Sequence, residues 1–141
     1  MSKQQQTGMR GVYLAAAELA ARGLIVSPTS RSAAGADLLI TDTNCANAYS
    51  VQVKTNGKAV GFWLVGEKAQ HIASRSHVYV FVNIQPKTGA HDFYVVPSKV
   101  VAQRMKVEVR AKSTWYAFYK KDALEFLGKW SLLGAEADSA A

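Results

Sequence analysis

The chain has 141 residues, a formal net charge of +7 and a single cysteine. This length suits one domain with its own hydrophobic core, and one cysteine excludes both an intrachain disulfide and a four-cysteine zinc site. We therefore predict one domain over residues 8–133 with flexible tails at 1–7 and 134–141, in a reducing, cytoplasmic compartment. No stretch approaches the roughly 18 apolar residues that span a bilayer, so no membrane partner is expected.

The N-terminal half predicts one helix followed by three strands. An Ala- and Leu-rich segment favours a helix over residues 8–22, which Gly23 would end. Strands are predicted at 24–26, 36–41 and 49–55. A Ser- and Gly-rich loop separates the first two strands, and an Asn-rich turn separates the second from the third.

The C-terminal half predicts further strands interleaved with short helices. The helices are expected at 67–74, at 98–105 after Pro97, and at 122–127. The strands are expected at 77–84, 91–96, 106–110 and 114–119. Helices and strands in this order predict an α/β domain in which a central mixed β-sheet is flanked by helices.

Glu18 lies in the middle of the first predicted helix, which is apolar almost all round. A carboxylate in such a helix is costly to bury unless it has a partner. One partner would be Arg22, which lies at the favourable spacing of four residues. The alternative is a metal ion or a lysine at the sheet, and the helix pattern alone leaves both open.

Two neighbouring strands carry the other candidate residues. Asp37 opens the strand at 36–41, where the ordinary interpretation is a solvated strand start, whereas Asp42 at the far end is assigned to the turn. Alternation in the strand at 49–55 puts Gln52 and Lys54 on one face. The same alternation is typical of any half-exposed antiparallel strand, so it does not by itself indicate a site.

Basic residues gather between positions 99 and 121, where Glu108 is the only acid and aromatic residues interleave. The basic residues there are Lys99, Arg104, Lys106, Arg110, Lys112, Lys120 and Lys121. Together with Arg31, in the loop before Asp37, they are candidate contacts to a phosphate backbone, and the alternative is a solvated basic surface. The three tryptophans, Trp63, Trp115 and Trp130, are expected in the core or an interface rather than as base-stacking platforms.

The order and spacing of these motifs resemble the PD-(D/E)xK nuclease superfamily. The matching residues are Glu18 in AAAELAARG, Asp37 in AGADLLI, and Gln52 and Lys54 in SVQVKTN. Over residues 9–133 the chain is similar to small bacterial members with a Gln-x-Lys variant motif, in which an aromatic segment (here GFWLV), a strand pair (VYVFVNI and DFYVVPS) and a Trp segment (KWSLL) follow. The resemblance implies a restriction-endonuclease-like core and an endonuclease that hydrolyses DNA phosphodiester bonds.

The resemblance also implies roles for individual residues. Asp37, Glu18, Gln52 and the backbone carbonyl of Val53 would hold Mg²⁺, for which Mn²⁺ can substitute, and Lys54 would position the attacking water. Glu18, Asp37, Gln52 and Lys54 are thus the implied catalytic residues. Gln52 departs from the ideal pattern, because Gln offers a neutral oxygen where Glu would offer an anionic ligand, and this lowers the expected metal affinity.

The expected partners are DNA, with branched and single-stranded forms included, and a second copy of the chain, since cutting two strands requires two sites. No organic cofactor is expected. Two other functions stay open. Gln52 and the basic segment suggest a catalytically weak or inactive nucleic-acid-binding module on the same fold, and exposed aromatic residues would suit a protein-interaction accessory subunit.

Overall fold

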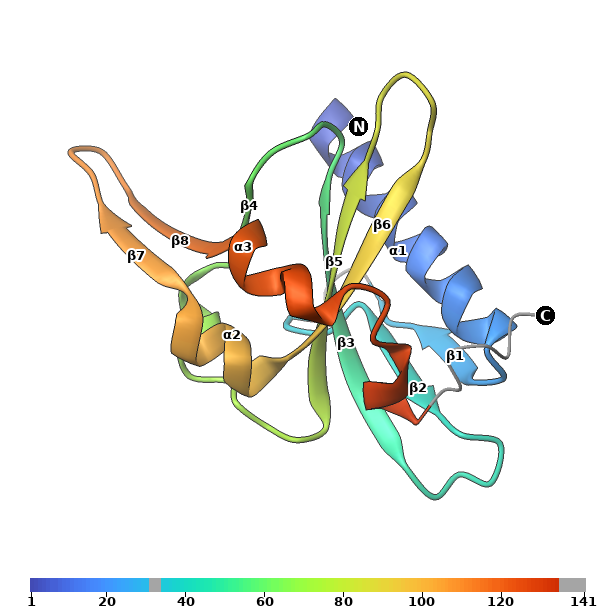
Figure 1. The fold of residues 1–141 in the computed structure, drawn as a ribbon. Coiled ribbons are helices and arrows are strands. Elements are labelled where there is room, and N and C mark those ends of the chain that lie inside the picture. Colours follow the sequence, from blue (N-terminus) through green and yellow to red (C-terminus); the bar gives the residue numbers. More distant parts are fainter. Residues whose placement is uncertain (31–33, 135–141) are drawn as a thin grey trace.

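A five-stranded mixed sheet forms the centre of the molecule in the computed structural model, which describes residues 1–30 and 34–134 (Figure 1). The strands lie in the order β1-β2-β3-β5-β6. Their bounds are β1 Ile25–Pro28, β2 Leu38–Thr41, β3 Ala48–Asn56, β5 His77–Ile84 and β6 His91–Pro97. Only β3 and β5 are parallel among these neighbours, so the predicted mixed sheet is confirmed.

Helix α1, Lys3–Ala21, covers one face of this sheet (Figure 1). It begins earlier than predicted, because Ser2 and Gln5 cap each other. The Ser2 hydroxyl accepts from the Gln5 backbone N–H at 3.1 Å, and the Gln5 side chain accepts from the Ser2 N–H at 3.0 Å. This capping box satisfies two of the free donors at the helix start. Most of the segment predicted as a flexible tail at 1–7 is therefore helical, and the tail predicted beyond Gly134 lies outside the described residues.

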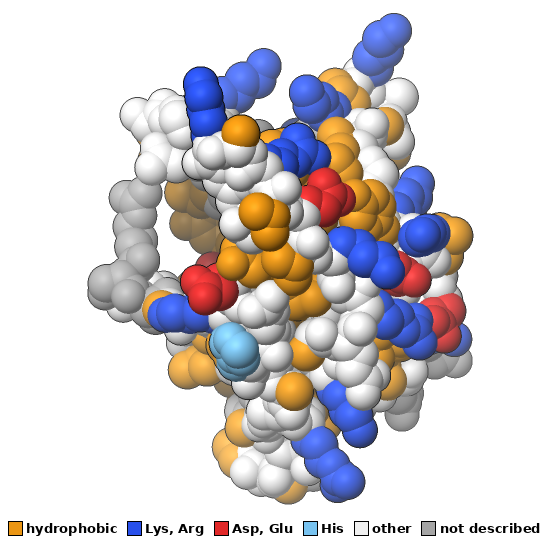
Figure 2. All heavy atoms as spheres, turned by 90° about the vertical axis from the view of Figure 1, so that its left-hand side faces the viewer, with side chains coloured by type: hydrophobic (Ala, Val, Ile, Leu, Met, Phe, Trp, Pro, Cys, Tyr) orange, Lys and Arg blue, Asp and Glu red, His pale blue; other side chains and the backbone are white. Residues whose placement is uncertain are grey.

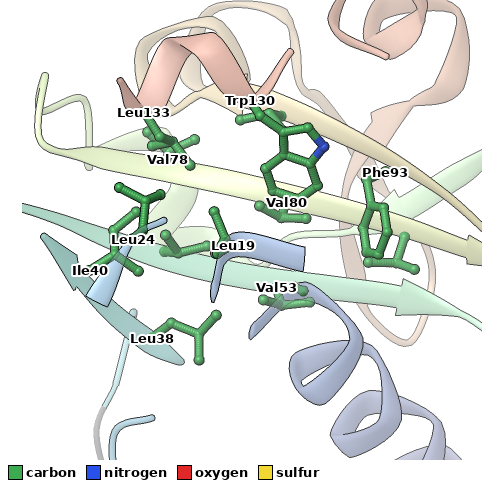
Figure 3. Packing of buried hydrophobic residues seen from close by; sticks show 14 of the residues in the cluster. Leu19, Leu24, Leu38, Ile40, Val53, Val78, Val80, Phe93, Trp130 and Leu133 are labelled. Carbon is green, nitrogen blue, oxygen red and sulfur yellow. The ribbon is translucent and has the colours of Figure 1, made fainter. Parts of the chain in front are cut away.

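The core between α1 and the sheet is built mostly from aliphatic side chains of α1 and the strands (Figure 3). Phe93 of β6 and, near the C-terminal end, Trp130 and Leu133 complete it. On α1, Gly11, Ala15 and Leu19 recur every four residues and point to the sheet. Gly11 is required there, since a Cβ at this position would lie 1.7 Å from Oγ1 of Thr55 on β3. The close approach fixes the first half of α1 directly against β3.

A second sheet and two short helices cover the opposite face of the central sheet. The sheet has the order β4-β8-β7, and its strands are β4 Phe62–Leu64, β7 Lys106–Val109 and β8 Thr114–Tyr119. The helices are α2 Ser98–Arg104 and α3 Lys120–Ala123, and the 3₁₀ turns η1 Glu67–Gln70 and η2 Leu124–Phe126 lie in the same layer. A third 3₁₀ turn, η3 Trp130–Leu133, packs into the core on the α1 side. Strand β5 is buried along its whole length between the two layers. The β7–β8 hairpin projects away from the central sheet (Figure 1).

The predicted helices at 67–74 and 122–127 are both shorter in the structure. The first is the single 3₁₀ turn η1, and the last is split into α3 and η2. Neither segment is long enough to stabilise a helix by its own hydrogen bonds, so the packing of Ala69 and Ala123 into the second core decides their conformation. No helix within residues 1–30 and 34–134 is long and apolar enough to cross a membrane.

The connection from β3 to the parallel strand β5 contains β4 and η1. Strand β4 does not join the central sheet but pairs with β8, near the C-terminal end of the chain. The connection between two strands of the central sheet therefore contains β4, which is a strand of the second sheet.

His77, at the start of β5, predicts a pH dependence of stability. Its side chain is buried, and Nδ1 lies 2.6 Å from Oγ of Ser50. Burial lowers the pKa of His77, so the unfolded chain takes up a proton at a higher pH than the folded chain does. The stabilisation is present above the ordinary histidine pKa of about 6.5 and is lost as the pH falls below it.

We expect urea unfolding to show this loss of stability below about pH 6.5 in the wild type, and a smaller loss in His77→Phe. His91→Gln is the matched control, because His91 is exposed. Equal pH dependence in the wild type and His77→Phe would contradict the assignment.

Candidate functional site

Asp37 is held against β3 at the point where β2 begins. Leu38 pairs with Val51, which places Asp37 opposite Gln52. The Asp37 backbone N–H donates to the Val51 carbonyl at 2.8 Å, and its Oδ2 accepts from Gln52 Nε2 at 3.0 Å and from the Val53 N–H at 2.8 Å. The carboxylate is therefore fixed in place by two donors of β3.

Beyond Gln52, no strand among the described residues pairs with the edge of β3 that faces β2, because β2 starts at Leu38 while β3 continues to Asn56; we call this stretch the open edge. The N–H and C=O of one strand residue point to the same side. The carbonyl oxygen of Val53 thus points to the open edge, where its N–H meets Asp37. Among the described residues the structure gives Oδ1 of Asp37 no hydrogen-bond partner.

A cleft of about 540 Å³ opens at this edge. It is lined by Asp37, Gln52 and Val53, by residues of α1 and by the loop after β1. The residues from α1, the end of β1 and the loop are Gln5, Gly8, Met9, Val12, Tyr13, Pro28, Thr29 and Ser30. Thr29 ties this loop to the site, because its Oγ1 donates to the Ala36 carbonyl at 2.7 Å and its N–H to the Asp37 carbonyl at 2.9 Å.

Lys54 lies in a second cleft of about 450 Å³ that shares Gly8 and Val53 with the first. The side chain is on the same face of β3 as Gln52, two residues further along the strand. Within the described part of the chain, Lys54 has no ion-pair partner. Asp37, Gln52, Val53 and Lys54 are thus brought together at the junction of two adjoining clefts.

The oxygen atoms at this junction are of the kind that Mg²⁺ prefers. They are Oδ1 of Asp37, the carbonyl oxygen of Val53 and the amide oxygen of Gln52, whose nitrogen already donates to Asp37. No group of three His, Cys, Asp or Glu side chains suited to a metal occurs in residues 1–30 and 34–134. These oxygen atoms are chemically suited to a divalent cation, and a single carboxylate charge lies among them.

Glu18 is not part of this arrangement. Its carboxylate accepts from Nη2 of Arg22 at 3.2 Å, and the Arg22 guanidinium lies over Trp130 at 5.3 Å. Because successive residues of a helix are rotated by about 100°, Glu18 lies on nearly the opposite side of α1 from the helix residues that line the cleft. The structure therefore favours the local ion pair with Arg22 and does not bring Glu18 to Asp37.

The predicted phosphate contacts do not line either cleft. Arg104 pairs with Glu125, and Arg110 pairs with Glu108 at 3.0 Å. The remaining members of the C-terminal basic segment are exposed, namely Lys99, Lys106, Lys112, Lys120 and Lys121. Arg31 lies outside the described residues. Figure 2 shows Lys and Arg side chains gathered among exposed apolar ones on the side from which the β7–β8 hairpin projects.

Tyr13 and Met9 are cleft residues that the sequence analysis missed. Both are apolar yet exposed, at 59% and 40% of their surface. Their spacing of four residues puts them on one side of α1. The signal was present in the sequence, but a helix that is apolar on every side does not reveal which side faces a cleft.

Comparison with known proteins finds similarity in structure alone. No family model matches the sequence, and no curated protein matches it. The structure is similar to a bacterial homing endonuclease, with a TM-score of 0.58 and 16% identity over 94% of this chain and 91% of the other. It is also similar to a Holliday junction resolvase from Archaeoglobus fulgidus, with a TM-score of 0.52 and 10% identity over 84% of this chain and 93% of the other. The chain therefore shares the fold of these two nucleases, an α/β restriction-endonuclease-like core with a central mixed sheet.

Proposed function

We propose that the protein is a metal-dependent endonuclease that hydrolyses DNA phosphodiester bonds at the Asp37 cleft. One observation carries the proposal. The Asp37 carboxylate is fixed by the Val53 N–H and the Gln52 amide beside an open strand edge, and Lys54 follows on the same strand. The nuclease fold supports the same conclusion.

In this proposal Asp37, the Val53 carbonyl and Gln52 hold Mg²⁺ or Mn²⁺, and Glu18 has no part in holding the metal. The bound cation supplies neutralisation of phosphate charge and a more acidic water. Lys54 orients the attacking water and offsets the negative charge that develops on the phosphate. Asp37 fixes the position of the metal site, because its Oδ2 atom already accepts hydrogen bonds from Gln52 and Val53 of β3.

The direct test is cleavage of single-stranded, duplex and branched DNA with Mg²⁺ or Mn²⁺. We expect the wild type to cut and Lys54→Ala to cut about 100-fold more slowly, because water positioning and charge stabilisation are lost together. Lys58→Ala is the matched control, as Lys58 is an exposed lysine in the following turn. Failure of the folded wild type to cut any of these substrates with either metal would contradict the proposal.

Gln52→Glu is expected to strengthen metal binding by about tenfold, because it adds a second anionic ligand. The same change removes the amide donor to Asp37 and places two carboxylates side by side, so the metal-free protein should be less stable. Calorimetric titration with Mn²⁺ measures the affinity, and thermal unfolding with and without Mn²⁺ measures the stability. Equal Mn²⁺ affinity in both proteins would place the metal elsewhere.

The single carboxylate at the junction favours a second candidate function, a nucleic-acid-binding module with little or no activity. It would bind DNA with a steep salt dependence and show no Mn²⁺ binding.

For the endonuclease we also propose a homodimer, because cutting two strands requires two active sites. Sedimentation of the protein with and without DNA tests this oligomeric state.

A further inference from the structure

The outer face of the second sheet carries a row of aromatic rings. In the register of this sheet, Phe62 pairs with Tyr119, and Glu108 pairs with Trp115. Because side chains alternate across a strand, Phe62, Tyr119 and Trp115 share the outer face. The ring centroids of Phe62 lie 5.7 Å from Tyr119 and 6.2 Å from Trp115, so the rings form one contiguous surface.

The core does not account for these rings. The neighbouring residues of the same strands, Trp63 and Phe118, point inward and are 1% and 0% exposed, which completes the core on the inner face. The three outer rings are only partly buried, and Leu64 beside them is 49% exposed. Apolar side chains that lie together on a solvent-facing surface indicate a binding surface. Trp63 and Trp130 lie in the core, as predicted, whereas Trp115 lies on this outer face.

The charge around this face favours a polyanion. The Arg110 guanidinium lies 3.9 Å from the centre of the Trp115 ring, and Lys106 points to the same side as Trp115. Glu108 is the acid on this face, and its carboxylate accepts from Arg110 at 3.0 Å and from the Tyr119 hydroxyl at 2.6 Å. Partly exposed rings beside basic side chains are the combination with which proteins bind single-stranded nucleic acids.

This face is continuous with the Asp37 cleft. Phe62 and Leu64 also line the second cleft together with Lys54, and that cleft meets the first at Gly8 and Val53. A strand lying on the aromatic face therefore has a path along one surface to Asp37. Bases in a duplex have their flat faces covered by stacking, so aromatic rings at a surface favour unpaired bases.

We infer that the outer face of the second sheet binds a single-stranded segment of nucleic acid by stacking bases on Phe62, Trp115 and Tyr119, and directs it to the Asp37 cleft. The inference identifies single-stranded nucleic acid as the substrate of the proposed endonuclease. Only the delivery of the strand to the Asp37 cleft rests on the proposed function. Stacking and charge supply the affinity, and little base sequence preference is expected because every base has a flat face.

The test is binding of a fluorescent oligothymidylate without divalent metal, followed by anisotropy. We expect Trp115→Ala and Phe62→Ala each to weaken binding by about tenfold or more, and Trp115→Phe to keep most of it, since an aromatic ring remains. Val109→Ala is the matched control, because Val109 is 82% exposed on the opposite face of β7. A blunt duplex of the same length should bind more weakly than the single strand.

Tryptophan fluorescence gives an independent measurement. Trp63 and Trp130 are buried at 1% and 2% exposure, so quenching by a stacked base should come from Trp115. We expect the oligothymidylate to quench the wild type and not Trp115→Phe. Thermal unfolding of each variant confirms that the fold is kept.

Unchanged binding in both alanine variants, an equal loss in Val109→Ala, or equally tight binding of the blunt duplex would overturn the inference. Metal-dependent cutting that is independent of Trp115 and Phe62 would also overturn it and leave the endonuclease proposal standing. Binding that depends on Trp115, in a protein that cuts no DNA, supports the inference and contradicts the endonuclease.

Discussion

Replacing Asp37 with Asn is expected to reduce metal-dependent DNA cleavage by at least about 100-fold while the fold is kept. Asn retains one oxygen that can accept from the Val53 N–H and from Gln52, so the join between β2 and β3 persists. What changes is the outward atom, where an NH₂ group replaces an anionic oxygen and cannot bind a cation. Initial cleavage rates with Mg²⁺ and Mn²⁺ measure the loss, and denaturant unfolding measures the fold.

Asp42→Asn is the matched control for this substitution. Asp42 follows β2, and its carboxylate accepts from the Ala46 N–H at 2.8 Å and from the Asn47 side chain at 3.1 Å. These turn contacts lower its pKa, the Ala46 bond most, and they confirm its assignment to the turn. Cleavage should be the same as in the wild type. Equal cleavage by wild type and Asp37→Asn would show that Asp37 takes no part in the reaction, and would contradict the proposed metal site.

Gly11→Ala is expected to destabilise the protein by about 2 kcal/mol, because the added methyl group overpacks the contact between α1 and β3. The new Cβ would lie 1.7 Å from Oγ1 and 2.9 Å from Cγ2 of Thr55. The gain in helix propensity from Gly to Ala, about 1 kcal/mol, offsets only part of the strain. Urea unfolding followed by circular dichroism measures the difference.

Gly8→Ala separates packing from propensity. It changes the same residue type on the same helix, yet nothing lies within 4 Å of its added Cβ. It should therefore stabilise the protein by about 1 kcal/mol through helix propensity alone. Adding Thr55→Ala to Gly11→Ala should recover part of the loss, since it removes Oγ1 and Cγ2 of Thr55 and leaves only its Cβ, 2.8 Å from the new methyl group. Equal stabilisation by both glycine substitutions would show that α1 does not approach β3 so closely.

The strand residues of the site were predictable because a strand has a period of two. Gln52 and Lys54 share a face in any strand that spans them, and the antiparallel pairing of Leu38 with Val51 then brings Asp37 opposite Gln52. Strand β5 has the predicted bounds for a related reason, since it is apolar apart from His77 and Asn83 near its two ends and is buried on both faces.

The position of Glu18 could not be predicted in the same way. When a helix is apolar on all sides, its sequence does not show which side its polar residue faces. The side that meets the sheet is set by Gly11, because a residue with a Cβ could not approach Thr55 so closely. The start of α1 was missed for a different reason. Its first turns are polar and Gln-rich, and their order depends on the capping contacts between Ser2 and Gln5 rather than on burial.

The path of the chain through β4 joins the two halves of the molecule in a way that local contacts do not reveal. Forming the parallel pair of β3 and β5 requires the intervening segment to be in place, and β4 in that segment is hydrogen-bonded to β8 near the C-terminal end. Unfolding the C-terminal hairpin therefore leaves the crossover without its partner. We infer a single cooperative unit of unfolding, in which slow amide exchange is lost from both sheets together.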